Sequence, residues 1–265
     1  MPAPPHPEQA ATKLTATYHR EEAARFSWYH CVDLGSGVVT DGEYDMASII
    51  SHYDFPDRME GTTVLDVGRA SGYFSFEFER RGARVTAADI ASFFDWDFVG
   101  GDKVRELRRA QVSDPDGFTS KHISGAFRFA KQVLGSSVEE KTINVYELDP
   151  DRFDGRKFDI VFAGSVTSHL RDPALAFERL YSVTKGKCII AAPSFDIRPV
   201  ADCPLMMLIG TADPDCRSWW IFNARGLTDL LRCAGFSSVK IVSSFKLRSR
   251  RSSQAVEHIV AHAEP

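Results

Sequence analysis

Two aspartates and two glycines lie within a stretch of 24 residues, from Asp66 to Asp89, in an order that could bind a ligand. Asp66 lies in an aliphatic run that is followed by Gly68 and Gly72, and Asp89 closes the next apolar run. Glycine lets the backbone turn sharply and approach a ligand closely. An acidic side chain at the carboxyl end of a strand suits the two hydroxyls of a ribose. This pattern predicts a ligand site with room for a ribose, although a Gly-x-x-x-Gly turn also occurs where a helix packs closely on a strand.

A strand, a turn, a helix and a second strand must position these residues. Residues 64–67 are aliphatic around Asp66, as in a buried parallel strand, and the glycines end that run. Residues 73–81 hold alternating phenylalanines that also suit a strand, but their helical spacing and the stop at Gly82 favour a helix. Residues 84–88 predict the second strand.

The rest of the chain alternates between short apolar runs and amphipathic stretches. Further strands are predicted at 142–146, 158–164, 187–192, 238–244 and 255–261. Helices are predicted at 13–27, 40–53, 103–109, 123–134, 173–184 and 223–234. This order predicts the α/β class, with a doubly wound, Rossmann-like, seven-stranded sheet and a C-terminal antiparallel hairpin.

The length of 265 residues suits one large α/β domain with elaborations. Residues 1–12 are rich in proline and lack apolar periodicity, so we predict disorder there. We expect a single domain at 13–265, with an N-terminal helical lid at 13–60 and insertions at 91–134 and 193–222. The aromatic residues of the lid either fold over the ligand or anchor the N-terminal helix.

Composition excludes several classes of protein. The 36 acidic and 32 basic side chains are nearly balanced, so no nucleic-acid partner is indicated. Five cysteines without a Cys-x-x-Cys pair favour reduced thiols over disulfides or zinc. No apolar run reaches a membrane span, and no signal core opens the chain. We predict a cytoplasmic protein without a membrane partner, and a homodimer is an open option.

The run Val-Leu-Asp-Val-Gly-x-x-x-Gly at 64–72, followed by Asp89, resembles the nucleotide-binding half of class I S-adenosylmethionine-dependent methyltransferases. The dinucleotide fingerprint Gly-x-Gly-x-x-Gly is absent, because Ala70 and Tyr73 occupy its second and third glycine positions. The segments 28–35, 76–83 and 169–173 make the chain similar to tRNA wobble-uridine carboxymethyltransferases and their small-molecule relatives.

The resemblance implies S-adenosylmethionine as cofactor and a set of residues that bind it. These are Asp66, Gly68, Arg69 and Gly72 at the methionine end, Asp89 at the ribose, Ile90, Glu147 and Leu148 at the adenine, and Gly164 behind the sulfonium. Asp149 is a rival to Glu147.

Two departures from the uridine-modifying enzymes concern the carboxylate of carboxy-S-adenosylmethionine. Ser168 replaces their tyrosine, and residues 28–46 contain none of their lysines. Burying a carboxylate without a cation costs several kcal/mol. We therefore predict that ordinary S-adenosylmethionine is used.

An oxygen or nitrogen nucleophile needs its proton removed, and histidine has a suitable pKa. His169 is the candidate catalytic base, with His30 and His122 in reserve, although His169 also suits a structural role at a helix start. Substrate contacts are predicted at Tyr29, His30, Trp96, Trp219 and Trp220. Asp159 is interpreted as structural, and no acidic spacing predicts a catalytic metal.

The function predicted from the sequence is methyl transfer to an oxygen or nitrogen of a small molecule, of natural-product or sugar-like type. The alternative is a tRNA uridine-modifying (carboxy)methyltransferase, suggested by the resemblance and by a basic run, Lys246, Arg248, Arg250 and Arg251. A third hypothesis, a non-catalytic protein on the same fold, conflicts with the intact Asp66, Gly68, Gly72 and Asp89.

Overall fold

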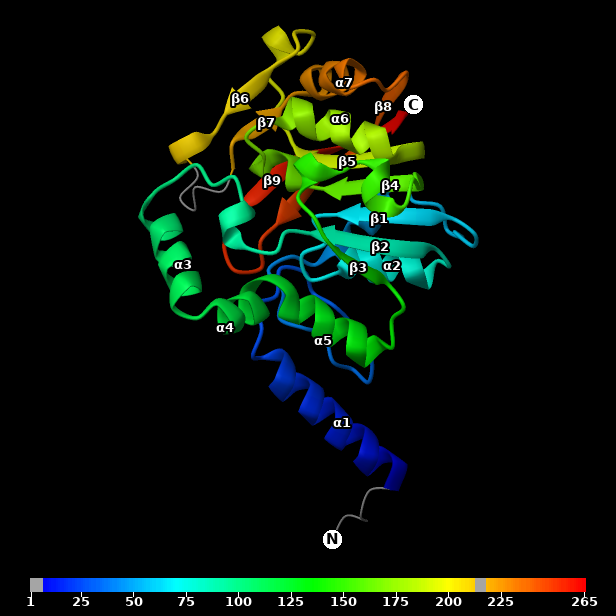
Figure 1. Cartoon of the computed structure of the whole chain (residues 1–265), viewed down its shortest axis with the longest axis vertical. Helices are drawn as coiled ribbons and strands as arrows, with labels where there is room; N and C mark the ends of the chain where they lie inside the picture. Colours follow the sequence, from blue (N-terminus) through cyan, green and yellow to red (C-terminus); the bar gives the residue numbers. More distant parts are fainter. Residues whose placement is uncertain (1–6, 213–217) are drawn as a thin grey trace.

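The computed structural model describes residues 7–212 and 218–265. Its centre is a sheet with strand order β3-β2-β1-β4-β5-β9-β8 (Figure 1). The strands are β1 (Thr63–Val67), β2 (Arg84–Asp89), β3 (Glu139–Thr142), β4 (Phe158–Gly164), β5 (Thr184–Pro193), β8 (Ser238–Arg248) and β9 (Ala255–Glu264). Strands β1 to β5 run parallel, whereas β9 is antiparallel to both β5 and β8. The expected seven-stranded sheet with its C-terminal hairpin is confirmed.

The strand order reverses between β1 and β4, because β2 and β3 follow β1 on one side and β5 follows β4 on the other. In open α/β sheets, ligands bind beyond the carboxyl ends of the strands at such a switch point. The topology therefore locates the site before any side chain is considered.

Period-two alternation in β1 distributes its residues between the two faces of the sheet. Leu65 and Val67 belong to a core cluster that includes Phe177 and Leu180 of α6 (Pro173–Val183) and Leu231 of α7 (Ala224–Cys233). Val64 belongs to the opposite cluster, with Phe74 and Phe78 of α2 (Tyr73–Arg80). Both faces are covered, as a parallel sheet requires.

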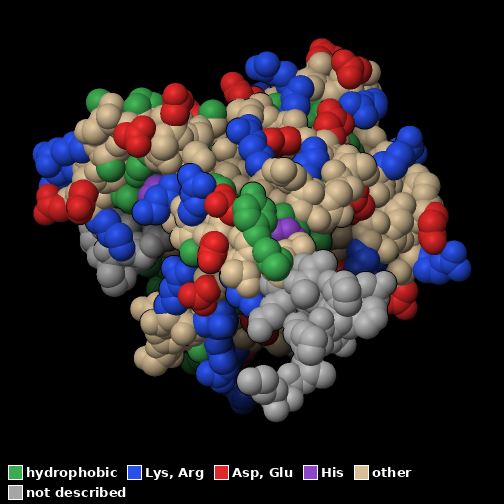
Figure 2. Space-filling model, turned by 90° about the horizontal axis from the view of Figure 1, so that it is seen from below, with side chains coloured by type: hydrophobic (Ala, Val, Ile, Leu, Met, Phe, Trp, Pro, Cys, Tyr) green, Lys and Arg blue, Asp and Glu red, His purple; other side chains and the backbone are tan. Residues whose placement is uncertain are grey.

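The insertion after β2 is largely helical. It contains α3 (Asp102–Ser113), α4 (Pro115–Thr119), a π turn at Ser120–Ser124 and α5 (Gly125–Leu134). Helix α1 (Pro7–Ala23) packs through Ala16 and Ala23 against Ala126 and Ala130 of α5, and its N-terminal end projects from the body (Figure 1). Lysine, arginine and acidic side chains are intermingled on the face seen from below (Figure 2).

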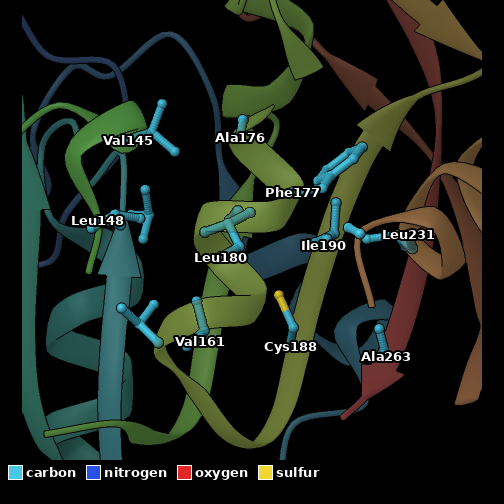
Figure 3. Packing of buried hydrophobic residues seen from close by; sticks show 14 of the residues in the cluster. Val145, Leu148, Val161, Ala176, Phe177, Leu180, Cys188, Ile190, Leu231 and Ala263 are labelled. Carbon is cyan, nitrogen blue, oxygen red and sulfur yellow. The ribbon is translucent and has the colours of Figure 1, made fainter. Parts of the chain in front are cut away.

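The face of the sheet beneath α6 shows why its strands are apolar. Val161, Cys188 and Ile190 lie side by side and point toward Phe177 and Leu180 (Figure 3). All five side chains are fully buried. Burying a large apolar side chain contributes roughly 1.5–3 kcal/mol. This packing holds β4 and β5, and with them the loop that follows β4.

Three predicted elements differ from the structure. Helix α1 begins at Pro7, so residues 7–12 are helical where disorder was predicted, while residues 1–6 lie outside the described residues. The helix predicted at 40–53 is wrong, because only short 3-10 turns form, at Met46–Ser48 and Ile50–Tyr53. A Cβ on Gly42 would lie 2.1 Å from the carbonyl carbon of His30, so close backbone packing holds this segment extended.

The strand predicted at 142–146 lies earlier in the chain. Strand β3 ends at Thr142, which pairs with Asp89, the last residue of β2. The amide of Ile143 still donates to the carbonyl of Asp89 at 2.9 Å, but β2 ends at Asp89, and Val145–Glu147 forms a 3-10 turn. The apolar residues Ile143, Val145 and Leu148 are buried in the core beneath α6 although they lie outside the strand. This shift of the strand changes which residues reach the site.

The insertion at 193–222 is more regular than expected, since β6 (Met206–Leu208) and β7 (Trp220–Phe222) form a small antiparallel sheet. Within 7–212 and 218–265, no helix is long and apolar enough to cross a membrane. Across the same residues, no three His, Cys, Asp or Glu side chains are arranged to hold a metal ion.

Candidate active site

A cavity of about 390 Å³ opens beyond the carboxyl ends of β1, β2, β3 and β4. The strand ends contribute Val67, Gly68, Ala70, Ser71, Asp89, Ile90, Ile143, Asn144, Val145, Gly164 and Ser165. The remaining wall comes from the lid, the first insertion and the loop after β4, and includes Tyr29, Phe93, Trp96, Tyr146 and His169. The predicted residues Gly68, Asp89, Ile90, Gly164, Tyr29, Trp96 and His169 therefore share one cavity.

The turn after β1 has a backbone that few residues adopt. Gly68 has φ +78°, and Ala70 takes a positive φ of 48° although it is not glycine. A Cβ on Gly68 would lie 3.0 Å from a methyl group of Val166, which also lines the cavity. The amide of Ala70 donates a hydrogen bond to Asp89 Oδ2 at 3.0 Å. The turn and the acidic residue thus form one unit.

Asp89 lies at the cavity wall with its side chain 18% exposed. Oδ1 accepts a hydrogen bond from the amide of Ile90 at 2.8 Å. Burial raises the pKa of Asp89, and the guanidinium of Arg69, 3.9 Å from Oδ2, opposes that rise. The carboxylate is fixed in place by backbone donors and is still reachable from the cavity.

Arg69, predicted to bind the cofactor, does not line the cavity. Its side chain is 3% exposed, donates to Glu140 at 2.7 Å and lies over the ring of Phe127. Glu140 also pairs with Arg128 at 2.9 Å. Arg69 therefore acts on the site through the charge of Asp89 and the position of the turn.

Asp66 and Gly72 are also set back from the cavity wall. Burial raises the pKa of Asp66 to about 7, and the hydroxyl of Ser75 donates to its Oδ2 at 2.5 Å. This bond ties β1 to α2. A Cβ on Gly72 would lie 2.6 Å from Phe127 and 2.7 Å from Phe76, so glycine is needed there for packing. Both residues shape the turn from behind.

The residues predicted at the adenine, Glu147 and Leu148, lie outside the cavity. Leu148 is fully buried in the core beneath α6, and Glu147 is half exposed, 3.8 Å from Arg152. Because β3 ends at Thr142, the positions after it that reach the cavity are Ile143, Asn144, Val145 and Tyr146. Sequence reasoning missed them, although the length of β2 limits how far β3 can pair.

The three histidines predicted as candidates occupy different environments. His169 ends the 3-10 turn Val166–His169 after β4, lines the cavity and lies 5.4 Å from the ring of Trp96. His122 lines it too, with Nδ1 3.0 Å from the hydroxyl of Ser27. His30 is buried outside the lining, and burial lowers its pKa to about 3. His30 is therefore poorly suited as a base or a substrate contact.

Trp219 and Trp220, predicted as substrate contacts, are not part of the lining. The indole N–H of Trp219 donates to the carbonyl of Asp97, and that of Trp220 donates to the carbonyl of Arg171 at 3.2 Å. They hold two loops that border the cavity, so they contribute to the site from outside.

Asp97 and Tyr146 form the centre of this support and were not predicted. The hydroxyl of Tyr146 donates to Asp97 Oδ2 at 2.5 Å, and the same oxygen accepts from the amide of Arg171 at 2.8 Å. The amide of Asp172 donates to the Tyr146 hydroxyl at 3.0 Å. Burial and the hydrogen bond to Asp97 raise the pKa of Tyr146. The aromatic insertion is thereby fastened to the loop that carries His169.

The turn of the C-terminal hairpin closes over the lid. The amide of Arg250 donates to the carbonyl of Glu43 at 2.9 Å, and its guanidinium pairs with Asp41 at 3.2 Å. The guanidinium of Arg251 donates to the carbonyl of Asp41 at 2.9 Å. Glu43 and Arg251 both line the cavity. Two residues of the basic run, Arg250 and Arg251, are thus bound to Asp41 and Glu43 of the lid.

A largely parallel sheet with a glycine turn, an acidic residue after β2 and a cavity at the switch point is the arrangement of Rossmann-like nucleotide-binding proteins. A family model described as a methyltransferase domain matches residues 40–241. The chain belongs to this methyltransferase family. Comparison with curated proteins found no match.

Solved structures share the fold at low sequence identity. The N-terminal domain of EvdMO1, with SAH bound, has a TM-score of 0.60 at 16% identity and covers 94% of this chain and 96% of that chain. An O-methyltransferase family protein from Burkholderia thailandensis has a TM-score of 0.52 at 14% identity, and the match covers 83% of this chain and 55% of that chain. The YcgJ protein of Bacillus subtilis has a TM-score of 0.53 at 13% sequence identity, and the match covers 81% of this chain and 96% of that chain. The expected fold and enzyme class, an S-adenosylmethionine-dependent methyltransferase, are confirmed.

Proposed function

We propose that the protein transfers a methyl group from S-adenosylmethionine to an oxygen or nitrogen of a small molecule, of natural-product or sugar-like type. The observation that carries the proposal is a single cavity that joins the glycine turn and Asp89 to His169. Its volume of about 390 Å³ is within the range of small-molecule sites.

The residues present fit the cofactor. Helix α2 begins after Gly72 without a side-chain cap, so its first amides can donate hydrogen bonds to the methionine carboxylate. Asp89 borders the cavity and accepts the ribose hydroxyls. We place the adenine between Ile90 and Val145, with Asn144 beside it in place of Glu147.

Bound S-adenosylmethionine supplies an activated methyl group, so the protein mainly aligns the nucleophile with it. Gly68 and Gly164 line the cavity where β1 and β4 meet, so their backbone can approach the methyl end. His169, next along the chain from β4, accepts the proton that the acceptor loses. General base catalysis of this kind contributes typically 10²–10⁴-fold.

Titration with S-adenosylhomocysteine tests the cofactor assignment, and we expect saturable, one-to-one binding. Absence of binding contradicts it. Native mass spectrometry then separates ordinary from carboxylated cofactor by mass. Ser168 is buried, donates to the carbonyl of Ser165 at 3.0 Å and does not line the cavity, which favours the ordinary form. Lys103 and Arg251 do line the cavity, so a co-purified carboxylated cofactor would overturn this choice.

His169→Gln tests the base. We expect methyl transfer to fall about 100-fold or more while the affinity for S-adenosylhomocysteine stays within about twofold, because the side chain acts on the acceptor. A variant with unchanged turnover would assign His169 a structural role.

The alternative of a tRNA uridine-modifying enzyme rests on the sequence resemblance. Arg250 of the basic run is engaged with Asp41, and charges of both signs are mixed on the face shown in Figure 2. A tRNA complex would weaken steeply with salt. A cytoplasmic location and a homodimer stay predictions from the sequence.

A further inference from the structure

The acceptor side of the cavity is built from aromatic rings. The ring of Trp96 is stacked on the ring of Phe98, with the centroids 5.2 Å apart and the planes inclined by 11°. The centroid of Trp96 also lies 5.5 Å from that of Phe93 and 5.4 Å from that of His169. Tyr146 lines the same cavity. Aromatic rings attract other flat rings in stacked or edge-to-face geometry, which adds to their burial.

Asp97 beside this wall, and Asn144 and Ser71 nearer the cofactor, are already hydrogen-bonded within the protein. Asp97 Oδ2 accepts from Tyr146 and from the amide of Arg171. Asn144 donates to the carbonyl of Asp95 at 3.0 Å and accepts from the amide of Tyr146 at 3.1 Å. The hydroxyl of Ser71, nearer the cofactor, accepts from the amide of Tyr29 at 2.8 Å.

This arrangement distinguishes between classes of acceptor. A sugar carries several hydroxyls, and each one buried without a partner costs free energy. A flat ring with one or two polar atoms needs few partners and is complementary to the aromatic wall. The indole N–H of Trp96 is buried without a hydrogen-bond partner among the described residues.

We propose that the acceptor is a flat aromatic or heteroaromatic molecule with one reactive O–H or N–H, packed on Trp96 with that group toward His169. This proposal rests on the proposed function, because it assumes methyl transfer at this cavity. The acceptor oxygen or nitrogen forms a bond to the methyl carbon as the carbon–sulfur bond breaks. The electron pair of the broken bond stays on sulfur, and the acceptor proton passes to His169.

The test uses the full-length protein saturated with S-adenosylhomocysteine and four probes: 7-hydroxycoumarin, 8-hydroxyquinoline, D-glucose and D-fucose. Binding is measured by calorimetry. We expect saturable binding of at least one aromatic probe below about 1 mM, and weaker or no binding of the sugars. Tighter binding of a sugar than of either aromatic probe, or no binding of any probe, overturns the proposal.

Matched variants locate the binding. Trp96→Leu should weaken the affinity for the aromatic probe about tenfold, the loss expected when a stacked ring is removed. Phe94→Leu is the control, because Phe94 is exposed on the same loop and does not line the cavity. Equal effects of both variants overturn the role of Trp96.

The proposed function fails separately from this inference. If the protein does not bind S-adenosylhomocysteine, the function itself is wrong. If it binds this cofactor product and prefers sugars, the function holds and only the class of acceptor is wrong.

Discussion

The two sides of the cavity are assembled in different ways. On the cofactor side, hydrogen bonds join residues close in sequence, with a separation of 9 residues for Ser75 and Asp66 and 19 for Ala70 and Asp89. On the acceptor side, the separation is 49 residues for Tyr146 and Asp97 and 122 for Trp219 and Asp97. A site built from one short segment is set locally, whereas a site built from distant loops depends on the whole fold.

The comparison predicts that the largest effect on cofactor binding comes from one side chain on the local side. Asp89→Asn should weaken the affinity for S-adenosylhomocysteine about 100-fold, because two hydrogen bonds to a charged group are weakened. Calorimetric titration measures the change.

Asp196→Asn is the control, since Asp196 is exposed and lies outside the cavity lining. A loss of less than about threefold in Asp89→Asn would show that the ribose lies elsewhere.

The lid should be the most sensitive part of the distant side. In Gly42→Ala, the new Cβ would lie 2.1 Å from the carbonyl carbon of His30, so the backbone must move. We expect a loss of about 3 kcal/mol in the free energy of unfolding, the upper end for overpacking. Urea denaturation measures it.

Gly135→Ala is the matched control, because Gly135 has open space around its Cβ position, although its φ of 61° adds some strain. If Gly42→Ala lowers the free energy of unfolding no more than Gly135→Ala does, the lid backbone adjusts to the new Cβ at little cost.

Acid should weaken the fold near His169. Burial lowers the pKa of His258 to about 4, against 6.5 in the unfolded chain. Between these values the unfolded chain binds a proton that the folded chain does not, so stability is complete above pH 6.5 and falls as the pH drops toward 4. From pH 7 to pH 5 the loss from this residue is about 2 kcal/mol.

His258→Gln should reduce the difference in unfolding free energy between pH 7 and pH 5 by about that amount. His52→Gln is the control, since His52 contacts the same Phe245 ring from a partly exposed position. An unchanged pH difference in His258→Gln would assign the acid sensitivity to other buried groups, His30 first among them.

The smallest expected change concerns the link between the insertion and the loop of His169. Tyr146→Phe removes the hydroxyl that donates to Asp97 and accepts from the amide of Asp172. We expect a loss of about 1 kcal/mol in unfolding free energy and a higher KM for the acceptor, with the affinity for S-adenosylhomocysteine unchanged. Weaker binding of S-adenosylhomocysteine would show that the two sides are coupled.

Much of the fold could be predicted, because buried parallel strands and glycine turns leave local patterns. The segment 63–90 was assigned from its own residues, and its strand, turn and helix are confirmed. The site was harder to predict. Asn144 and Val145 line the cavity and Glu147 and Leu148 do not, because the end of β3 depends on where β2 ends. Trp219 and Trp220 were predicted to contact the substrate, but both lie outside the cavity lining, because composition alone does not show which side of a loop faces a cavity.

By itself the sequence determined the doubly wound sheet, the turn from Gly68 to Gly72 and the place of Asp89, because each depends on short-range conformational preference and on apolar periodicity. Only the tertiary structure decided that Arg69 faces Glu140, that Asp97 fastens Tyr146 to the loop of His169, and that Arg250 holds the lid. These contacts join segments that are distant in the chain, and packing of the whole domain brings them together.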